Sequence, residues 1–166
     1  MWLEQLPILY YLAPALGLAL LIRWNCRSFQ LFAAFMFFGV FLHETLHLIT
    51  GAILNAKPVG MSVIPRRGRT GTMELGSVCF SNITWYNALP LALAPLFGVP
   101  LAMAAAHWRI SQGWTLQWID APIWMALASV FLSCWPSSTD WRISLRSWPV
   151  YLGAVGYGAW PYLPFA

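Results

Sequence analysis

The chain has 166 residues, of which 60% are hydrophobic and only 8% are charged. Soluble domains carry about 25% charged residues, because polar groups must cover their surface. The mean hydropathy of +0.64 and the 11 tryptophans instead indicate an exterior that faces lipid. This composition excludes a soluble globular domain, a disordered chain, a nucleic-acid-binding protein and a disulfide-rich secreted fold.

Apolar stretches between the charged residues predict the membrane spans, since a spanning helix needs about 20 mostly apolar residues. The first stretch starts close to Met1 without a basic segment before it, which favours an uncleaved signal anchor. The last is the weakest, because glycines and a proline interrupt it, and a re-entrant or interfacial tail is the alternative. We expect an all-α polytopic membrane protein with about five transmembrane helices, within a range of four to six, at residues 8–22, 29–54, 85–108, 114–135 and 148–165.

The polar stretch at residues 55–84 predicts a small membrane-associated β-hairpin after the second span. Val59, Met61 and Val63 alternate with small residues, a turn-like Pro/Gly-rich segment follows, and the stretch then becomes strand-like again. We expect this hairpin to lie near the membrane face, where a free strand edge can hold an extended peptide by β-augmentation. The alternative is a plain interfacial loop whose arginines bind anionic headgroups.

Basic residues are distributed unevenly over the predicted loops, which allows the positive-inside rule to orient the chain. With a cytoplasmic N-terminus, the outer loops hold Arg23, Arg27 and Arg109. The inner loops then hold twice as many basic residues, namely Lys57, Arg66, Arg67, Arg69, Arg142 and Arg146. We therefore expect the N-terminus in the cytoplasm, with the second and fourth spans both ending on that side.

An HExxH motif, His43-Glu44-Thr45-Leu46-His47, lies inside the second span. Residues four apart share one face of an α-helix, so both imidazoles can bind one metal ion, and the glutamate can act as a base toward water. In a chain with three histidines, a chance match is expected only about 0.001 times. The structural alternative is a pair of hydrogen-bonded histidines packed between helices, which would leave a buried Glu44 without a partner.

A catalytic zinc usually has three protein ligands, so a further ligand is expected among the remaining acids. Glu4 is too near the N-terminus, Glu74 lies in the polar loop, and Asp120 lies toward the outer end of the fourth span. Asp140 follows the fourth span on the same side as the end of the motif helix, and it can reach the site on an extended helix or on a loop that folds back. The alternative for Asp140 is an N-cap or a surface acid paired with Arg142.

These features resemble the site-2 proteases, which are intramembrane zinc metalloproteases that cut membrane-embedded or membrane-anchored substrates. The resemblance covers residues 29–142 and rests on HExxH in a hydrophobic span, a hairpin-like loop, a further span and an aspartate after a later span. The segment Asn87-Ala-Leu-Pro-Leu-Ala-Leu-Ala-Pro95 and the segment Pro136-Ser-Ser-Thr-Asp140 resemble a compact branch with a Pro-Ser-x-x-Asp motif. The best-known members instead have Asn-x-x-Pro-x-x-x-Leu-Asp-Gly around the aspartate, so this chain departs from them there.

The resemblance implies that His43, His47 and Asp140 bind one Zn²⁺ and that Glu44 is the catalytic base. It also favours zinc over iron or cobalt, which the ligand types alone do not exclude. Residues 1–166 would then form a single membrane-embedded metalloprotease domain that hydrolyses peptide bonds of membrane proteins with metal-activated water. Candidates for oxyanion or substrate contacts are Asn87, Ser137 and Ser138.

The expected partners are a transmembrane or membrane-anchored protein substrate, the lipid bilayer and a membrane partner subunit that helps to select substrates, with no nucleic acid. The expected location is the cell membrane of a bacterium or archaeon, with the N-terminus and the active-site opening on the cytoplasmic side. Two alternatives stay open. A non-proteolytic membrane metal-binding protein, such as a carrier or sensor, would need the ligands but not the base, and a small membrane scaffold would need neither.

Overall fold

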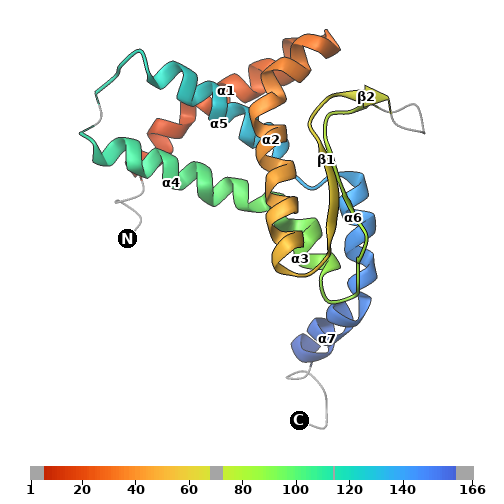
Figure 1. The fold of residues 1–166 in the computed structure, drawn as a ribbon. Helices are drawn as coiled ribbons and strands as arrows, with labels where there is room; N and C mark the ends of the chain where they lie inside the picture. The colour runs from red at the N-terminus through yellow and green to blue at the C-terminus, as the bar shows by residue number, and fades with distance from the viewer. Residues whose placement is uncertain (1–5, 68–72, 114, 160–166) are drawn as a thin grey trace.

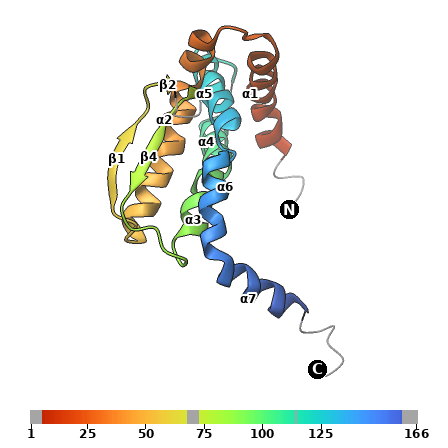
Figure 2. The ribbon, with the colours of Figure 1, turned by 90° about the vertical axis from the view of Figure 1, so that its right-hand side faces the viewer.

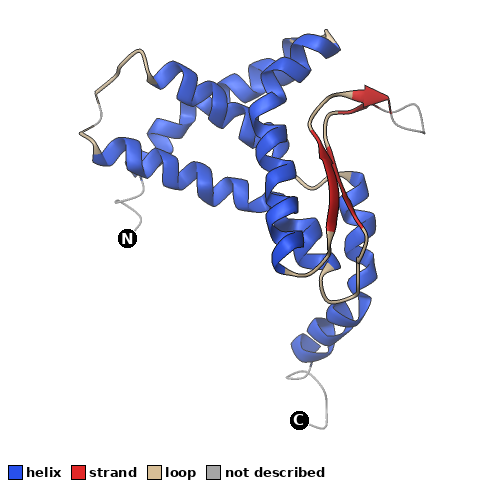
Figure 3. Cartoon of the chain, viewed as in Figure 1, coloured by secondary structure: helices blue, strands red, loops and turns tan. Residues whose placement is uncertain are grey.

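The computed structural model describes residues 6–67, 73–113 and 115–159, and it consists mainly of helices with one narrow β-hairpin (Figure 1, Figure 3). In chain order the helices are α1 (Leu6–Asn25), α2 (Phe29–Ile53), α3 (Ala88–Leu93), the 3₁₀ turn η2 (Ala94–Phe97), α4 (Gly98–Ser111), α5 (Asp120–Ser133), α6 (Ser138–Ser144), the 3₁₀ turn η3 (Leu145–Ser147) and α7 (Trp148–Ala159). The strands are β1 (Pro58–Ser62), β2 (Arg66–Arg67), β3 (Met73–Glu74) and β4 (Ser77–Phe80).

Three helical stretches among the described residues are long and apolar enough to cross a membrane, namely Pro7–Asn25, Phe29–Ile53 and Ala88–Ser111. They correspond to the first three predicted spans. Large apolar side chains along these helices are exposed, as a lipid-facing surface requires. The chain is therefore compatible with a place in a membrane.

The fourth and fifth predicted spans are shorter than expected. Helix α5 has 14 residues, and at 1.5 Å per residue its length of about 21 Å is less than the ~30 Å hydrocarbon core of a bilayer. Helix α7 has 12 residues, and residues 160–165 of the last predicted span lie outside the described part of the chain. Figure 2 shows α7 extending away from the other helices.

The third predicted span consists of α3, η2 and α4 in direct succession. Pro95 lies at the start of η2, and a proline has no N–H to donate to the carbonyl four residues earlier. The carbonyl of Leu91 therefore lacks its usual α-helical partner and accepts a bond from the N–H of Ala94 instead. This leaves Leu91 able to accept a further hydrogen bond from another element.

The hairpin predicted between the second and third spans is present. Strand β1 pairs antiparallel with β4, and β2 pairs antiparallel with β3 closer to the tip. The register shifts between Pro58 and Gly60, which marks a β-bulge at the base.

The hairpin runs alongside α2 (Figure 1). Its predicted place near a membrane face stays a prediction. Phe80 near its base packs on Gly51, and Gly76 packs on the middle of the helix. Nearer the tip, Pro65 and Ala33 line a common recess. Since Gly51 and Ala33 are separated by about 27 Å of helical rise, the hairpin follows α2 over most of its length.

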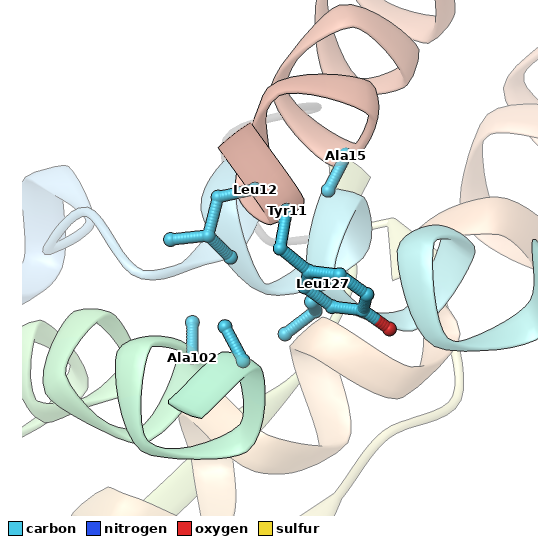
Figure 4. Packing of buried hydrophobic residues seen from close by; sticks show 6 residues of the cluster. Tyr11, Leu12, Ala15, Ala102 and Leu127 are labelled. Carbon is cyan, nitrogen blue, oxygen red and sulfur yellow. The ribbon is translucent and has the colours of Figure 1, made fainter. Parts of the chain in front are cut away.

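A buried polar network joins α1, α4 and α5. The carboxylate of Asp120 accepts hydrogen bonds from the Tyr11 hydroxyl (2.9 Å), from Arg109 Nε (2.9 Å) and from the backbone N–H of Gln117 (2.8 Å). An apolar cluster built from the same three helices adjoins this network and shares Tyr11 with it (Figure 4). Its buried members are Tyr11, Leu12, Ala15, Ala102, Ala106 and Leu127.

This network brings together segments that the predicted alternation of spans placed apart. Tyr11 is close to the start of α1, Arg109 is close to the end of α4, and Asp120 begins α5. The predicted scheme placed the start of the first span and the 109–120 connection on opposite membrane faces, whereas the structure brings them together. The physical reason is that a carboxylate buried among apolar helices needs partners, and its partners come from α1 and α4.

The count of basic residues in the loops is affected as well. Strand β2, which contains Arg66 and Arg67, lies beside the N-terminal half of α2 (Figure 1) and not at its C-terminal end. Arg109 is bonded into the network beside Tyr11. The basic residues counted as inner are therefore spread along α2, and the cytoplasmic N-terminus stays a prediction.

Candidate metal centre

A cavity of about 450 Å³ lies beside the middle of α2. The motif side chains His43, Glu44 and His47 line one wall of this cavity. The segment from Glu74 through β4 lines another wall, and the end of α5 together with the start of α6 lines a third. The predicted motif therefore faces an internal cavity and not the apolar exterior.

Close packing against α5 fixes the position of the motif helix. The backbone N–H of Gly39 donates a hydrogen bond to Ser129 Oγ at 2.7 Å. A Cβ atom at Gly39 would lie 2.1 Å from the Ser129 carbonyl oxygen and 2.3 Å from Ser133 Oγ, so only glycine fits there. This contact lies one turn before His43, and it brings the end of α5 within reach of that histidine.

Two backbone carbonyls orient the histidine rings. His43 Nδ1 donates to the carbonyl of Ser133 at 2.6 Å, and His47 Nδ1 donates to the carbonyl of Leu91 at 2.8 Å. Ser133 is the last residue of α5, and Leu91 precedes the proline at the start of η2, so both carbonyls lie where regular helical bonding ends. A neutral histidine that carries its proton on Nδ1 presents a lone pair on Nε2. Both Nε2 atoms are therefore available to a metal ion.

A short helix brings Asp140 to the histidines. Helix α5 ends before Pro136, and α6 begins with Ser137 as its N-cap. The backbone N–H of Ser137 donates to Asp140 Oδ2 at 2.7 Å, and the N–H of Asp140 donates to Ser137 Oγ at 3.2 Å, which completes a capping box. Of the two routes open in the sequence, the chain breaks at the proline and starts a new helix. The N-cap reading and the ligand reading of this aspartate are therefore compatible.

The three candidate ligands lie close enough together to hold one metal ion. His47 Nε2 lies 3.2 Å from His43 Nε2 and 3.2 Å from Asp140 Oδ1, and His43 Nε2 lies 3.6 Å from Asp140 Oδ2. In a tetrahedral site with bonds of 2.0–2.1 Å, neighbouring ligand atoms are about 3.3–3.4 Å apart. The residues present therefore fit a tetrahedral metal ion with one position left for a water or substrate oxygen.

The carboxyl group of Asp140 is held in its ionised form. Burial raises the pKa of a carboxyl group, but the hydrogen bond that the backbone N–H of Ser137 donates to Asp140 Oδ2 lowers the pKa of Asp140 and favours its ionised form. Asp140 makes no ion pair with Arg142 within the described part of the chain, so the surface-acid alternative finds no support. An ionised carboxylate is the form that binds a metal ion.

Glu44 lies in the same cavity but outside the ligand cluster. Its side chain is only 7% exposed, and it makes no hydrogen bond or ion pair with any other described residue. Gly76 packs directly against it, since a Cβ atom at Gly76 would lie 2.7 Å from Glu44 Oε1. A buried carboxylate without a fixed partner is free to exchange a proton with a water molecule in the cavity.

The remaining predicted site residues divide into two groups. Ser137 and Ser138 line the cavity that contains His43, His47 and Asp140. Asn87 is fully buried outside it, where its amide donates to the carbonyls of Leu54 and Asn82. The structure therefore gives Asn87 a role in holding the hairpin base, away from the candidate ligands.

The other acids considered as ligands also lie elsewhere or make other contacts. Glu74 lines the cavity and pairs with Arg66 across the hairpin at 3.6 Å. Asp120 belongs to the network with Tyr11, and Glu4 lies outside the described residues. Among the described residues, the group that can hold a metal ion is His43, His47 and Asp140, with ligand atoms within 4.8 Å of one another.

Comparison of the chain with protein-family models, with curated proteins and with solved structures found no significant match. A functional assignment therefore depends on the residues and geometry of this site.

Proposed function

We propose that this chain is an intramembrane zinc metalloprotease, similar to the site-2 proteases, that hydrolyses peptide bonds of membrane-embedded or membrane-anchored proteins. The observation that carries the proposal is the meeting of His43, His47 and Asp140 in one cavity with the unpaired carboxylate of Glu44. A site that only stored or carried a metal would need the three ligands, but it would have no use for a buried base beside them.

In this proposal each residue has a separate task. Zinc, when bound by the two histidines and Asp140, would lower the pKa of a water molecule and polarise the substrate carbonyl. Glu44 accepts a proton from the attacking water and later donates it to the leaving amine. The Ser133 and Leu91 carbonyls keep both rings in the tautomer that leaves Nε2 unprotonated.

The substrate would lie in extended form beside β4, along the cavity that holds the candidate ligands. Strand β4 pairs with β1 along one edge, and Ser77 and Val78 of β4 line the metal cavity. An extended peptide can add to its other edge by backbone hydrogen bonds. Ser137 and Ser138, on the opposite side of the cavity, are the proposed contacts for the oxyanion or the substrate backbone.

The decisive experiment replaces Glu44 by Gln, which keeps the shape of the side chain and removes the base. Purified Glu44→Gln should retain one zinc per chain by elemental analysis, and it should lose at least about a hundredfold in cleavage of a membrane-segment peptide. Cleavage near the wild-type rate would refute the protease mechanism. An unchanged metal-dependent activity of another kind would support a carrier or sensor, and a purified wild type without stoichiometric metal would support a scaffold.

The location proposed for the protein is a cell membrane of a bacterium or archaeon, with the N-terminus and the site opening in the cytoplasm. The three helices that are long and apolar enough to cross a membrane support the membrane location. The orientation is tested by the labelling of single cysteines placed at Lys57 and at Asn25 in intact cells. Labelling of the Asn25 position alone by a membrane-impermeant reagent is expected, and the reverse pattern would invert the orientation.

A further inference from the structure

A second recess, lined by apolar side chains, adjoins the cavity of the candidate ligands on the side of the hairpin tip. It has a volume of about 400 Å³. Its lining residues are Ala33, Ala34, Phe37, Val40, Val63, Pro65 and Leu75. Val40 and Leu75 also line the cavity that contains His43 and Glu44, so the two hollows meet at these side chains.

We propose that this recess is the subsite that selects the substrate by binding one of its apolar or aromatic side chains, an inference that rests on the proteolytic function proposed above. Phe37 and Ala33 precede Glu44 by about 10 and 16 Å along α2 at 1.5 Å per residue. An extended peptide advances about 3.3 Å per residue, so the bound side chain lies about three to five residues from the scissile bond.

The apolar lining of the recess determines which class of substrate side chain it can bind. No residue of the recess carries a charge or a polar side-chain group, so a charged substrate residue would lose its hydration without gaining a partner. An apolar side chain from a membrane segment loses no hydration of this kind and gains contacts with Phe37, Val40 and Leu75. The two alanines create the hollow, since a larger side chain at either position would fill it.

Continuity with the metal cavity favours a substrate over other occupants. A peptide that lies extended beside β4 and continues toward the hairpin tip must pass Val40 and Leu75, which border both hollows. A lipid acyl chain or a second copy of the chain has no reason to continue into the ligand cluster. Both are outcomes that the following experiment distinguishes.

Photo-crosslinking tests the occupant without requiring catalysis. Full-length Glu44→Gln protein carries a photo-reactive phenylalanine analogue at position 37 and is placed in phosphatidylcholine vesicles with a synthetic Leu/Ala-rich membrane-segment peptide. Position 41 is the matched control, because Phe41 is an exposed phenylalanine of the same helix that lines neither hollow. A peptide adduct from position 37, with several-fold less from position 41, is expected. Adducts with lipid or with a second chain in place of the peptide would overturn the proposal.

A specificity series tests the same recess through cleavage. Peptides that carry Phe, Leu, Ala or Asp at the third to fifth positions from the cleaved bond are compared for wild type and Ala34→Phe. In wild type a large apolar residue at one position should raise kcat/KM by roughly tenfold over Ala. Ala34→Phe should abolish this preference by raising KM for the peptides with a large residue.

Ala52→Phe is the control for the series, since Ala52 is exposed on α2 and lines neither hollow. Retention of the full preference in Ala34→Phe, with cleavage intact, would overturn the subsite and leave the protease standing. If wild type cleaves no peptide while position 37 still crosslinks to it, the protease function fails and the binding role of the recess survives.

Discussion

Three hydrogen-bond acceptors meet at His43, His47 and Asp140. Both histidines donate their Nδ1 protons to carbonyl oxygens, so their Nε2 atoms are left with lone pairs that face each other at 3.2 Å and face an ionised carboxylate. Atoms that all accept repel one another at this distance unless a cation lies between them. A metal ion would satisfy all three acceptors at once, which supports the proposal that the cluster is a metal site and not a pair of packed histidines.

Removal of the third ligand should remove the metal. Loss of a residue that merely orients a ligand costs roughly 10- to 100-fold in metal affinity, so loss of the ligand itself in Asp140→Ala should cost more than that. Glu74→Ala is the matched control, because Glu74 also lines the cavity but is partly exposed and paired with Arg66. Elemental analysis of the purified proteins checks this, and full zinc content in Asp140→Ala would refute the ligand assignment.

The close contact between Gly76 and Glu44 predicts a second effect. A methyl group at Gly76 would lie 2.7 Å from Glu44 Oε1 and 2.8 Å from Val40 Cγ1, so the hairpin or the base must shift. Gly76→Ala should lower kcat on the order of tenfold or more, because catalysis depends on the position of the base, while zinc stays bound. Gly60→Ala on the same hairpin meets nothing within 4 Å and should behave as wild type. Equal rates for the two variants would show that the hairpin does not position Glu44.

At the scale of the elements, interruptions of regular secondary structure build the site. Ser133 offers its carbonyl because α5 ends there, and Leu91 offers its carbonyl because Pro95 interrupts the helix that follows. Asp140 reaches the cavity because α6 starts anew after Pro136 with a capping box. Continuous membrane spans would have kept all of these polar groups within their own helices.

The contact between α2 and α5 should be sensitive to a single methyl group. In Gly39→Ala the new Cβ would lie 2.1 Å from a backbone oxygen of α5, which cannot move without the helix, and overpacking of this kind costs about 1–3 kcal/mol. Because the carbonyl of Ser133 would move with α5, metal affinity should fall together with the free energy of unfolding. Gly17→Ala in α1 is the control, since a Cβ there meets nothing within 4 Å, and it should be neutral or slightly stabilising. Unfolding in detergent and zinc titration measure the two effects, and unchanged values for Gly39→Ala would argue against this packing.

At the scale of the whole molecule, two buried polar groups lie in different parts of the fold and have different roles. The ligand cluster lies between α2, the hairpin and α6, whereas the network around Asp120 joins α1, α4 and α5. The carboxylate of Asp120 is fully buried and accepts hydrogen bonds from Tyr11, Arg109 and Gln117, so it stabilises the fold. Asp120, which has a full set of hydrogen-bond donors, therefore has a structural role. Asp140, which faces two histidines, is the aspartate that we propose binds a metal ion.

Loss of one donor to this network should reduce stability without affecting the site. Tyr11→Phe removes the hydroxyl bonded to Asp120, and a hydrogen bond to a charged group contributes about 1–3 kcal/mol, with lower values common in membrane proteins. The thermal midpoint in detergent should fall, while zinc content and cleavage per folded molecule stay at the wild-type level. Tyr10→Phe is the control, because Tyr10 is 70% exposed. A loss of zinc in Tyr11→Phe would show that the two regions are coupled.

The sequence by itself determined the features that depend on local pattern. Apolar runs predicted the three long helices, the 3.6-residue period placed His43 and His47 on one face, and alternation with turn residues predicted the hairpin. Tertiary structure alone decided the rest, because the periodicity of apolar residues along the chain does not specify contacts between residues far apart in the sequence. It brought Asp140 to the histidines through a broken helix, turned the hairpin along α2, and paired Asp120 with Tyr11 across more than a hundred residues. For Asp140 and Asp120, a buried polar group bonds to partners that only the folded chain brings near, and burial and pairing are properties of the whole fold.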